Sequence, residues 1–163
     1  MKLIVFSDTH GVNYGMREVM TLQQNADLFI HLGDGAPDFV TLCQGFGKPY
    51  AAVRGNCDLA SDLPLEMTLN LGGKTIFLTH GHAYGVKTAF GPIRRRGKEV
   101  GADIILFGHT HTPMIEYYAE EENSPYYLMN PGALGRSYGV IPSTYGVIEI
   151  KGKNLLISHG KLE

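Results

Sequence analysis

Seven side chains of metal-binding type occupy a recurring position in this sequence, in that each follows a short apolar run. The set is made of imidazole, carboxylate and amide groups: Asp8, His10, Asp34, Asn56, His80, His109 and His111. Such nitrogen and oxygen donors suit Mn²⁺, Fe, Co²⁺ or Zn²⁺ better than a structural zinc site built from thiolates. Taken singly, an aspartate or asparagine after a strand often only caps a turn. Together with four histidines at matching positions, these residues instead predict a shared metal site.

The spacing within the set indicates how side chains that are far apart in the sequence could meet. Residues i and i+2 of an extended chain project to the same side. The Asp8–His10 and His109–His111 pairs could therefore each direct two donors into one cavity. Glycine permits a sharp turn beside a crowded site. Glycines next to these donors are Gly33, Gly55, Gly81 and Gly108.

The elements that must position these donors alternate in the first half of the chain. Short apolar runs predict buried strands at residues 2–6, 27–32 and 50–53. Residues 14–24 and 37–43 are predicted to be helices, the first from its helical spacing of apolar residues and the second from Pro37 at its first turn. This alternation favours right-handed crossovers and a largely parallel sheet. Ligands bind at the edge where the carboxyl ends of such strands meet.

The second half of the chain is richer in strands. A hairpin is expected over residues 65–79, with its turn at Gly72-Gly73, and a helix over residues 92–100. Further strands are predicted at residues 104–107, 114–119, 126–129, 145–150 and 154–158. We therefore expect an α/β fold in which two packed mixed β-sheets are flanked by helices. One domain covers residues 1–163, with Leu162 and Glu163 interpreted as a cloning remnant without a role.

Composition narrows the class of protein. With 44% hydrophobic and 18% charged residues, the chain is typical of a globular protein. The net charge of −2 gives no reason to expect nucleic-acid or membrane-surface binding. Cys43 and Cys57 cannot form a disulfide framework of the kind that small secreted domains use. No signal segment opens the sequence, and no apolar run reaches the roughly 18–20 residues of a membrane helix. These features predict a cytoplasmic protein.

The motifs resemble those of the calcineurin-like metallophosphoesterases, and in particular the small YfcE-type phosphodiesterase branch. The resemblance covers nearly the whole chain and includes the Asn130-Pro131-Gly132 turn. Its principal motifs are Asp8-Thr9-His10, Gly33-Asp34, Gly55-Asn56-Cys57-Asp58, His80-Gly81-His82 and Gly108-His109-Thr110-His111. Five elements in the family's order and spacing are far more specific than one Asp-x-His.

The resemblance implies a site for two divalent metal ions, with Mn²⁺ the first choice and Fe, Co, Ni or Zn as alternatives. Asp8, His10 and His111 would hold the first ion. Asn56, His80 and His109 would hold the second, and Asp34 would bridge both. A small phosphoester, a diester rather than a monoester, would be hydrolysed by direct attack of a metal-bridging hydroxide without a phosphoenzyme.

The residue after Asn56 departs from the wider superfamily. Many members have a histidine there that is thought to protonate the leaving group, whereas this chain has Cys57. A thiol with an ordinary pKa of about 8.5 is a poorer acid at neutral pH than an imidazolium near 6.5. We therefore expect a bias toward activated aryl phosphoesters. The expected catalytic residues are Asp34, Asn56, Cys57 and His82, with His82 contacting substrate or orienting a ligand.

Several interpretations stay open beside this one. A non-catalytic scaffold, as in the metallophosphoesterase-fold subunit of retromer, and a pure metal-binding protein are the alternatives to an enzyme. Arg94, Arg95 and Arg96 are expected on a solvated helix face, and Arg54 could approach the site. The Asn130-Pro131-Gly132 turn and Arg136 are interpreted equally well as a rim loop or as a structural turn. His31 is expected to form a hydrogen bond in the core, and Asp58 is expected to orient a ligand or cap a turn. The tyrosine pairs at residues 117–118 and 126–127 are expected to cover a sheet or a subunit contact in a homodimer.

Overall fold

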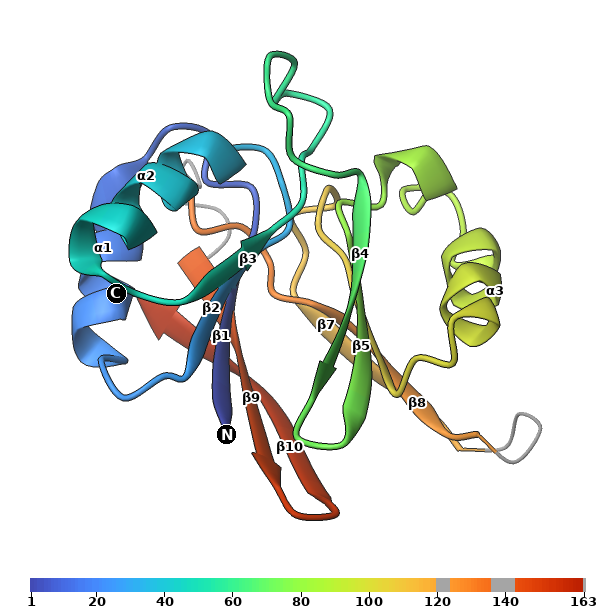
Figure 1. Ribbon diagram of the computed structural model, residues 1–163. Coiled ribbons are helices and arrows are strands. Elements are labelled where there is room, and N and C mark those ends of the chain that lie inside the picture. The colour runs from blue at the N-terminus through green and yellow to red at the C-terminus, as the bar shows by residue number, and fades with distance from the viewer. Residues whose placement is uncertain (120–123, 136–142, 163) are drawn as a thin grey trace.

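Two five-stranded sheets lie face to face, with helices on their outer sides (Figure 1). The computed structural model describes residues 1–119, 124–135 and 143–162. The first sheet has the order β10-β9-β1-β2-β3, and the second has the order β4-β5-β6-β8-β7. Each sheet mixes parallel and antiparallel pairs, because β1 pairs parallel with β2 and antiparallel with β9, while β5 pairs parallel with β6 and antiparallel with β4. The predicted architecture is confirmed.

The first sheet is built from both ends of the chain. Its strands are β1 (Lys2–Phe6), β2 (Leu28–His31), β3 (Tyr50–Ala52), β9 (Ser143–Lys151) and β10 (Asn154–Leu162). The helices α1 (Asn13–Leu22) and α2 (Ala36–Phe46) cover its outer face (Figure 1). Helix α2 continues three residues beyond the predicted end at residue 43. It ends where Gly47 adopts a left-handed conformation with φ 62°, which glycine tolerates without strain.

The second sheet comes from the middle of the chain. Its strands are β4 (Glu66–Leu71), β5 (Lys74–Thr79), β6 (Ile104–Leu106), β7 (Met114–Tyr118) and β8 (Tyr126–Asn130). A short 3-10 helix, η1 (His82–Tyr84), follows β5 and was not predicted, and α3 (Gly91–Glu99) lies on the outer face. The ring of Tyr117 lies tilted against that of Tyr127, and Tyr118 stacks on Tyr126, so these tyrosine pairs cover the β7–β8 ladder.

The core follows the alternation of side chains along each strand. In β1, Leu3 and Val5 pack in a cluster between the two sheets, while Ile4 and Phe6 pack toward the helices. All four side chains are fully buried. Since both faces of β1 are covered, its sequence is a continuous apolar run rather than an alternating one.

Two sequence-based expectations need correction. Leu162, for which the sequence suggests no role, pairs with Ser143 in β10 and packs against the cluster beneath α1 and α2, while Glu163 lies outside the described residues. The arginines of α3 do not form a purely solvated face. Arg94 donates to the Tyr126 hydroxyl at 2.7 Å, and Arg96 pairs with Glu66 at 2.7 Å. These two contacts tie α3 to the second sheet.

No helix within residues 1–119, 124–135 and 143–162 is both long and apolar enough to cross a bilayer.

Candidate metal centre

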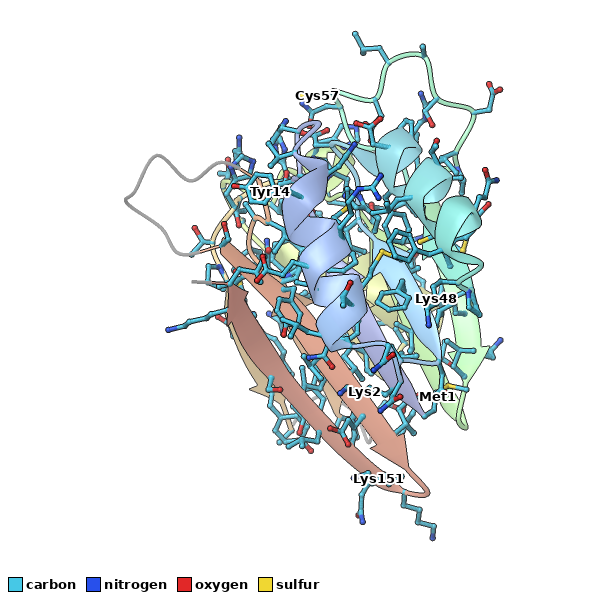
Figure 2. The ribbon with its side chains drawn as sticks, turned by 90° about the vertical axis from the view of Figure 1, so that its left-hand side faces the viewer. Met1, Lys2, Tyr14, Lys48, Cys57 and Lys151 are labelled. Carbon is cyan, nitrogen blue, oxygen red and sulfur yellow. The ribbon has the colours of Figure 1, made fainter. Side chains whose placement is uncertain are left out.

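The seven predicted donors gather at one end of the molecule, on the loops that leave β1, β2, β3, β5 and β6. Figure 2 labels Cys57 at this end, with Met1 and Lys151 toward the other. The donors form three overlapping groups, and within each group the donor atoms lie within 4.8 Å of one another. The groups are Asp8, His10 and His111; Asp34, His80 and His109; and His10, Asp34 and Cys57. Both sheets therefore contribute to one site.

The backbone is strained at five of these positions. Asp8, His10, Asp34, His109 and His111 all have positive φ, between 45° and 66°. Within the described residues these are the only non-glycine residues with that conformation. Residues other than glycine adopt it rarely and at a cost of about 1–3 kcal/mol each, and such residues cluster at functional sites. The strain turns each donor out of its strand and toward the shared centre.

Two glycines make the close approach of these loops feasible. A Cβ on Gly55 would lie 2.1 Å from Oδ1 of Asp34, and a Cβ on Gly108 would lie 1.9 Å from Oγ of Ser7. Contacts this short do not occur in folded proteins, so any side chain at either position would displace the donor beside it. The glycines noted in the sequence thus act here through their lack of a side chain.

His80 shows most clearly that the site fits a cation. Its ring is fully buried, and Nδ1 donates to the Leu32 carbonyl at 2.8 Å. The other nitrogen, Nε2, faces Oδ1 of Asn56 at 3.1 Å, Oδ2 of Asp34 at 3.4 Å and Oδ1 of Asp8 at 3.9 Å. A neutral ring would present a lone pair to these oxygens, so a proton or a metal ion is needed among them. A metal-binding histidine commonly donates its second nitrogen to a backbone carbonyl in this way.

The pKa of His80 reflects the same need for positive charge among the oxygens around its ring. Burial lowers the pKa of His80, but the hydrogen bond and charge of Asp34, with the charge of Asp8, outweigh burial, so the pKa lies above its ordinary value. The opposite holds for His109, whose pKa is lowered by burial and by the charges of His80 and Lys87.

A second concentration of donors surrounds Asp8. Its Oδ1 atom is buried without a hydrogen-bond donor of its own, and it lies 3.1 Å from Nε2 of His111. The Nε2 atoms of His10 and His111 are 3.4 Å apart. Burial raises the pKa of Asp8, but the interaction with His111, the charge of His80 and the hydrogen bond from Ser7 outweigh burial, so the pKa lies below its ordinary value. Two ring nitrogens and one carboxylate oxygen thus face a common point.

Asp34 connects the two groups of donors. Its side chain is only 3% exposed and lies 3.4 Å from His80 and 4.0 Å from His10, measured from Oδ2 to each Nε2. The other oxygen, Oδ1, accepts a hydrogen bond of 2.8 Å from the Cys57 backbone N–H. Burial raises the pKa of Asp34, but hydrogen bonds from His80 and Cys57 hold it well below its usual range. The carboxylate is therefore ionised and faces both halves of the site.

Asp58 is a supporting residue, as expected from the Gly-Asn-Cys-Asp motif. Its carboxylate accepts backbone hydrogen bonds of 2.8 Å from Asp34, Gly35 and Gly55. These contacts join the loop after β2 to the loop after β3, and so set the positions of Asp34 and Asn56.

Sequence reasoning missed the roles of two further residues. Ser7 donates to Oδ2 of Asp8 at 2.6 Å, and that oxygen also accepts the His109 backbone N–H at 3.0 Å. Asn130 donates to the Gly108 carbonyl at 2.9 Å and to Oγ1 of Thr110 at 3.0 Å, which holds the loop bearing His109 and His111. The Asn130-Pro131-Gly132 motif was the available signal for the second role. Arg136 lies outside the described residues.

His31 lies beneath the site and forms the core hydrogen bonds expected of it. Its Nδ1 accepts the Gly33 backbone N–H at 3.0 Å, so Nε2 carries the proton and donates to Oγ1 of Thr9 at 3.1 Å. Burial lowers the pKa of this fully buried ring to about 4. The neutral ring thus braces the two loops that carry His10 and Asp34.

A cavity of about 520 Å³ opens beside the donors. His10, Asp34 and Cys57 line it toward the donor cluster, and Pro37, Asp38 and Leu59 line it farther out. His82 is not among the residues that line this cavity; its ring centroid lies 5.4 Å from that of His80, and its buried Nδ1 has no hydrogen-bond partner within the described residues. Its pKa is lowered by burial and then by the charge of His80, with a smaller contribution from the charge of Arg54.

Known proteins resemble this chain over most of its length. Residues 1–153 match the family model described as the calcineurin-like phosphoesterase superfamily domain. The probable metallophosphoesterase YsnB of Bacillus subtilis is 34% identical over 135 residues, which cover 82% of this chain and 75% of YsnB. The phosphodiesterase YfcE of Escherichia coli is 29% identical, with 91% of this chain and 88% of YfcE covered.

Solved structures share the same architecture. A predicted phosphoesterase from Streptococcus pneumoniae superposes with a TM-score of 0.82 at 27% identity, covering 98% of this chain and 88% of that one. Vps29 from Entamoeba histolytica, crystallised with Zn²⁺, superposes with a TM-score of 0.77 at 17% identity, covering 99% of this chain and 98% of that one. At that identity the likeness to Vps29 shows the fold alone.

Proposed function

Because the chain belongs to the calcineurin-like phosphoesterase superfamily, we propose that it hydrolyses a small phosphodiester with two divalent cations bound at this centre. The observation that carries the proposal is the placement of Asp34, whose carboxylate faces both His80 and His10. One ion would be held by Asp8, His10 and His111 and the other by Asn56, His80 and His109, with Asp34 between them. Mn²⁺ is the proposed metal, with Fe, Co, Ni and Zn as alternatives suited to the same donors.

The chemistry divides between the cations and the chain. Bound cations would lower the pKa of a water molecule and polarise the phosphoryl oxygens, so no side-chain nucleophile and no phosphoenzyme are needed. Asn56 and Asp34 would hold the cations in position beside the reacting phosphoryl group. Cys57 faces the cavity, where its S–H can donate a proton to the leaving oxygen. His82, whose ring lies beside that of His80, would contact the substrate or orient a ligand. Transfer of labelled phosphate from substrate to the protein would contradict this scheme.

The cavity supports a diester better than a monoester. Beyond the donors its lining includes apolar Pro37, Leu59 and Ala60, which can pack against a second substituent on phosphorus. The carboxylate of Asp38, in this outer part, disfavours further negative charge on the substrate. We therefore expect a small substrate with one phosphodiester group and an uncharged or cationic substituent.

A comparison of two aryl substrates tests the proposal. With Mn²⁺ present, bis(p-nitrophenyl) phosphate should be hydrolysed with a higher kcat/KM than p-nitrophenyl phosphate. Asp34→Asn should lower kcat/KM by about a thousandfold, because the loss of several kcal/mol of transition-state stabilisation corresponds to roughly that factor. Asp62→Asn, on an exposed residue outside the cavity lining, is the matched control and should keep full activity.

A non-catalytic scaffold is the competing proposal. The fold alone does not decide between the two, since Vps29 shares it at only 17% identity. A scaffold has no physical need for seven convergent donors, five of them on strained backbone. Two bound ions per chain without turnover of either substrate would favour the scaffold and overturn the enzyme.

A further inference from the structure

Cys57 belongs to a group of possible metal donors that the proposed ligand set does not use. Its Sγ, an imidazole nitrogen of His10 and a carboxylate oxygen of Asp34 lie within 4.8 Å of one another. The thiol is exposed to the cavity, and His10 is 41% exposed, so a cation could reach all three from solvent. The group combines one sulfur, one nitrogen and one oxygen donor, which is the mixture that Zn²⁺ and related soft cations bind.

The position of Cys57 is set by backbone contacts on both sides of it. Its own N–H donates to Oδ1 of Asp34 at 2.8 Å. The next residue, Asp58, holds the Gly55 backbone N–H at 2.8 Å and donates its own N–H to the Gly55 carbonyl at 3.3 Å. These bonds keep the loop against Asp34, so the backbone as well as the side chain fixes the position of the sulfur.

We propose that Cys57 is a thiolate ligand for soft cations, and that Cd²⁺ bound by Cys57, His10 and Asp34 forms a non-productive state that competes with Mn²⁺. On binding, the sulfur–hydrogen bond is exchanged for a sulfur–metal bond, a water molecule leaves the metal, and the proton passes to solvent without any change of oxidation state. Mn²⁺ prefers oxygen and nitrogen donors and leaves the thiol protonated. The thiol would thus discriminate between metals at the proposed two-cation centre. This inference therefore rests on the proposed function.

The chain would lose two functions in the soft-metal state. The thiol proton, which we assign to the leaving oxygen, is gone once sulfur binds the cation. His10 and Asp34 are also withdrawn from the two-cation arrangement. We therefore expect Cd²⁺ to inhibit the Mn²⁺-dependent reaction, and the inhibition to weaken when the sulfur is removed.

Cobalt spectroscopy tests the sulfur–metal bond without any activity measurement. Co²⁺ is added to the metal-free wild-type protein, Cys57→Ser, Cys57→Ala and Cys43→Ala, and the visible and near-ultraviolet spectra are recorded. Cys43 lies on the buried face of α2, so Cys43→Ala is the matched control for loss of a cysteine. We expect sulfur-to-cobalt charge-transfer absorption in the wild type and in Cys43→Ala, and its absence in both Cys57 variants. Circular dichroism establishes that each variant is folded, and Cys57→Ala replaces Cys57→Ser where the latter is not.

The outcomes separate this inference from the proposed function. Visible cobalt bands without charge-transfer absorption in the wild type would overturn the thiolate ligand and leave the two-cation centre standing. Survival of the charge-transfer band in the Cys57 variants would overturn the thiolate ligand as well. A metal-free protein that takes up no Co²⁺ in equilibrium dialysis would overturn the metal centre itself, and the inference with it.

Affinity measurements give the expected size of the effect. Removal of an outer partner of a ligand already costs about 10–100-fold in metal affinity, so loss of a direct sulfur ligand should weaken Cd²⁺ binding by at least about tenfold. Mn²⁺ affinity should change by less than about twofold, because hard cations do not use the sulfur. Equal weakening of Cd²⁺ and Mn²⁺ in Cys57→Ser would contradict metal discrimination by the thiol.

Discussion

At the scale of single residues, the site depends on side chains whose protonation is set by their neighbours rather than by their type. His80 and His109 are both imidazoles of one cluster, yet the pKa of His80 is raised by Asp34 and Asp8 while that of His109 is lowered by burial and nearby cations. A neutral His109 and a His80 that shares a proton or a metal with three oxygens are therefore chemically different groups. Substitutions at this scale should act on chemistry or on pH dependence.

Cys57→His should raise turnover on substrates with poor leaving groups. An imidazolium is a better proton donor than a thiol near neutral pH, and a better acid matters most when the departing alkoxide is a strong base. The gain should reach about tenfold on alkyl phosphodiesters and be small on p-nitrophenyl diesters, where general acid catalysis contributes little. Rates measured with Mn²⁺ over a series of leaving groups give the slope. An unchanged slope would show that the residue at this position does not protonate the leaving group.

His31 should make the protein less stable in mild acid. Its pKa is lowered from 6.5 to about 4 in the folded chain, chiefly by burial, so the unfolded chain binds a proton at pH values where the folded chain does not. The stabilisation is complete above pH 6.5 and is lost as pH falls toward 4. Between pH 7 and pH 5 this amounts to about 2 kcal/mol of unfolding free energy.

Urea unfolding of the metal-free wild type and His31→Gln at both pH values measures this contribution. His80 and His111 have raised pKa values and act in the opposite direction, since their contribution is lost as pH rises, but they are present in both proteins. The wild type should lose about 2 kcal/mol more than the variant on going to pH 5. Parallel pH profiles would show that His31 is not the source.

At the scale of elements, the strands end where the donors begin, and the loops that follow are packed against one another. Asp58 ties the loop after β2 to the loop after β3, and Asn130 at the end of β8 holds the loop after β6. The space between loops is so small that glycine is needed where they meet, as at Gly55 and Gly108. Loop spacing, rather than the presence of the donors, should therefore control metal affinity.

Gly55→Ala should weaken Mn²⁺ binding and also lower the stability of the fold, because the new Cβ would lie 2.5 Å from the Asp34 backbone N. The new Cβ would lie 2.1 Å from Oδ1 of Asp34 and would push that carboxylate away from the cluster. We expect a loss of about 10–100-fold, as for other changes that misplace a ligand. Gly45→Ala in α2 is the control, because nothing lies within 4 Å of its Cβ. It should bind Mn²⁺ normally and gain about 0.5–1 kcal/mol of stability from the removal of a helical glycine. Calorimetric titration compares the two, and equal affinities would contradict the role given to Gly55.

At the scale of the whole molecule, the centre is divided between the two sheets. Asp8, His10 and Asp34 leave the first sheet, whereas His80, His109 and His111 leave the second. Polar contacts across the sheets are already present, as in the hydrogen bond from His80 to the Leu32 carbonyl. Cations held by both sets would link the sheets at one end, while the apolar cluster between them holds the rest.

Metal binding should therefore stabilise the folded protein as a whole. At a free Mn²⁺ concentration of about 100 times Kd, one site adds about 2.7 kcal/mol, which for a chain of this size raises Tm by about 5–10 °C. Thermal unfolding with Mn²⁺ and then with excess chelator measures the shift. In Asp34→Asn the shift should shrink strongly, because the group that faces both sets has lost its charge. An equal shift in that variant would show that Mn²⁺ binds elsewhere.

Local pattern in the sequence was enough to predict the two-sheet architecture, the strands that end at the candidate site and the polar side chains that gather there. Apolar runs and their polar ends report burial and strand termination directly, because each depends on only a few neighbouring residues. The same holds for Asp58, whose place in the Gly-Asn-Cys-Asp motif indicated a supporting role that its three backbone hydrogen bonds bear out.

Only the tertiary structure decided how the donors are grouped, which ring nitrogens carry protons and what supports each loop. The Nε2 of His80 faces oxygens from three loops, and the loops bearing Ser7 and His109 come together at Asp8 from opposite sheets. The arginines of α3 were misjudged for the same reason, since their partners Tyr126 and Glu66 are about 30 residues away in the sequence. Such distances are set by how two sheets pack and not by the periodicity of either, so no local pattern contains them.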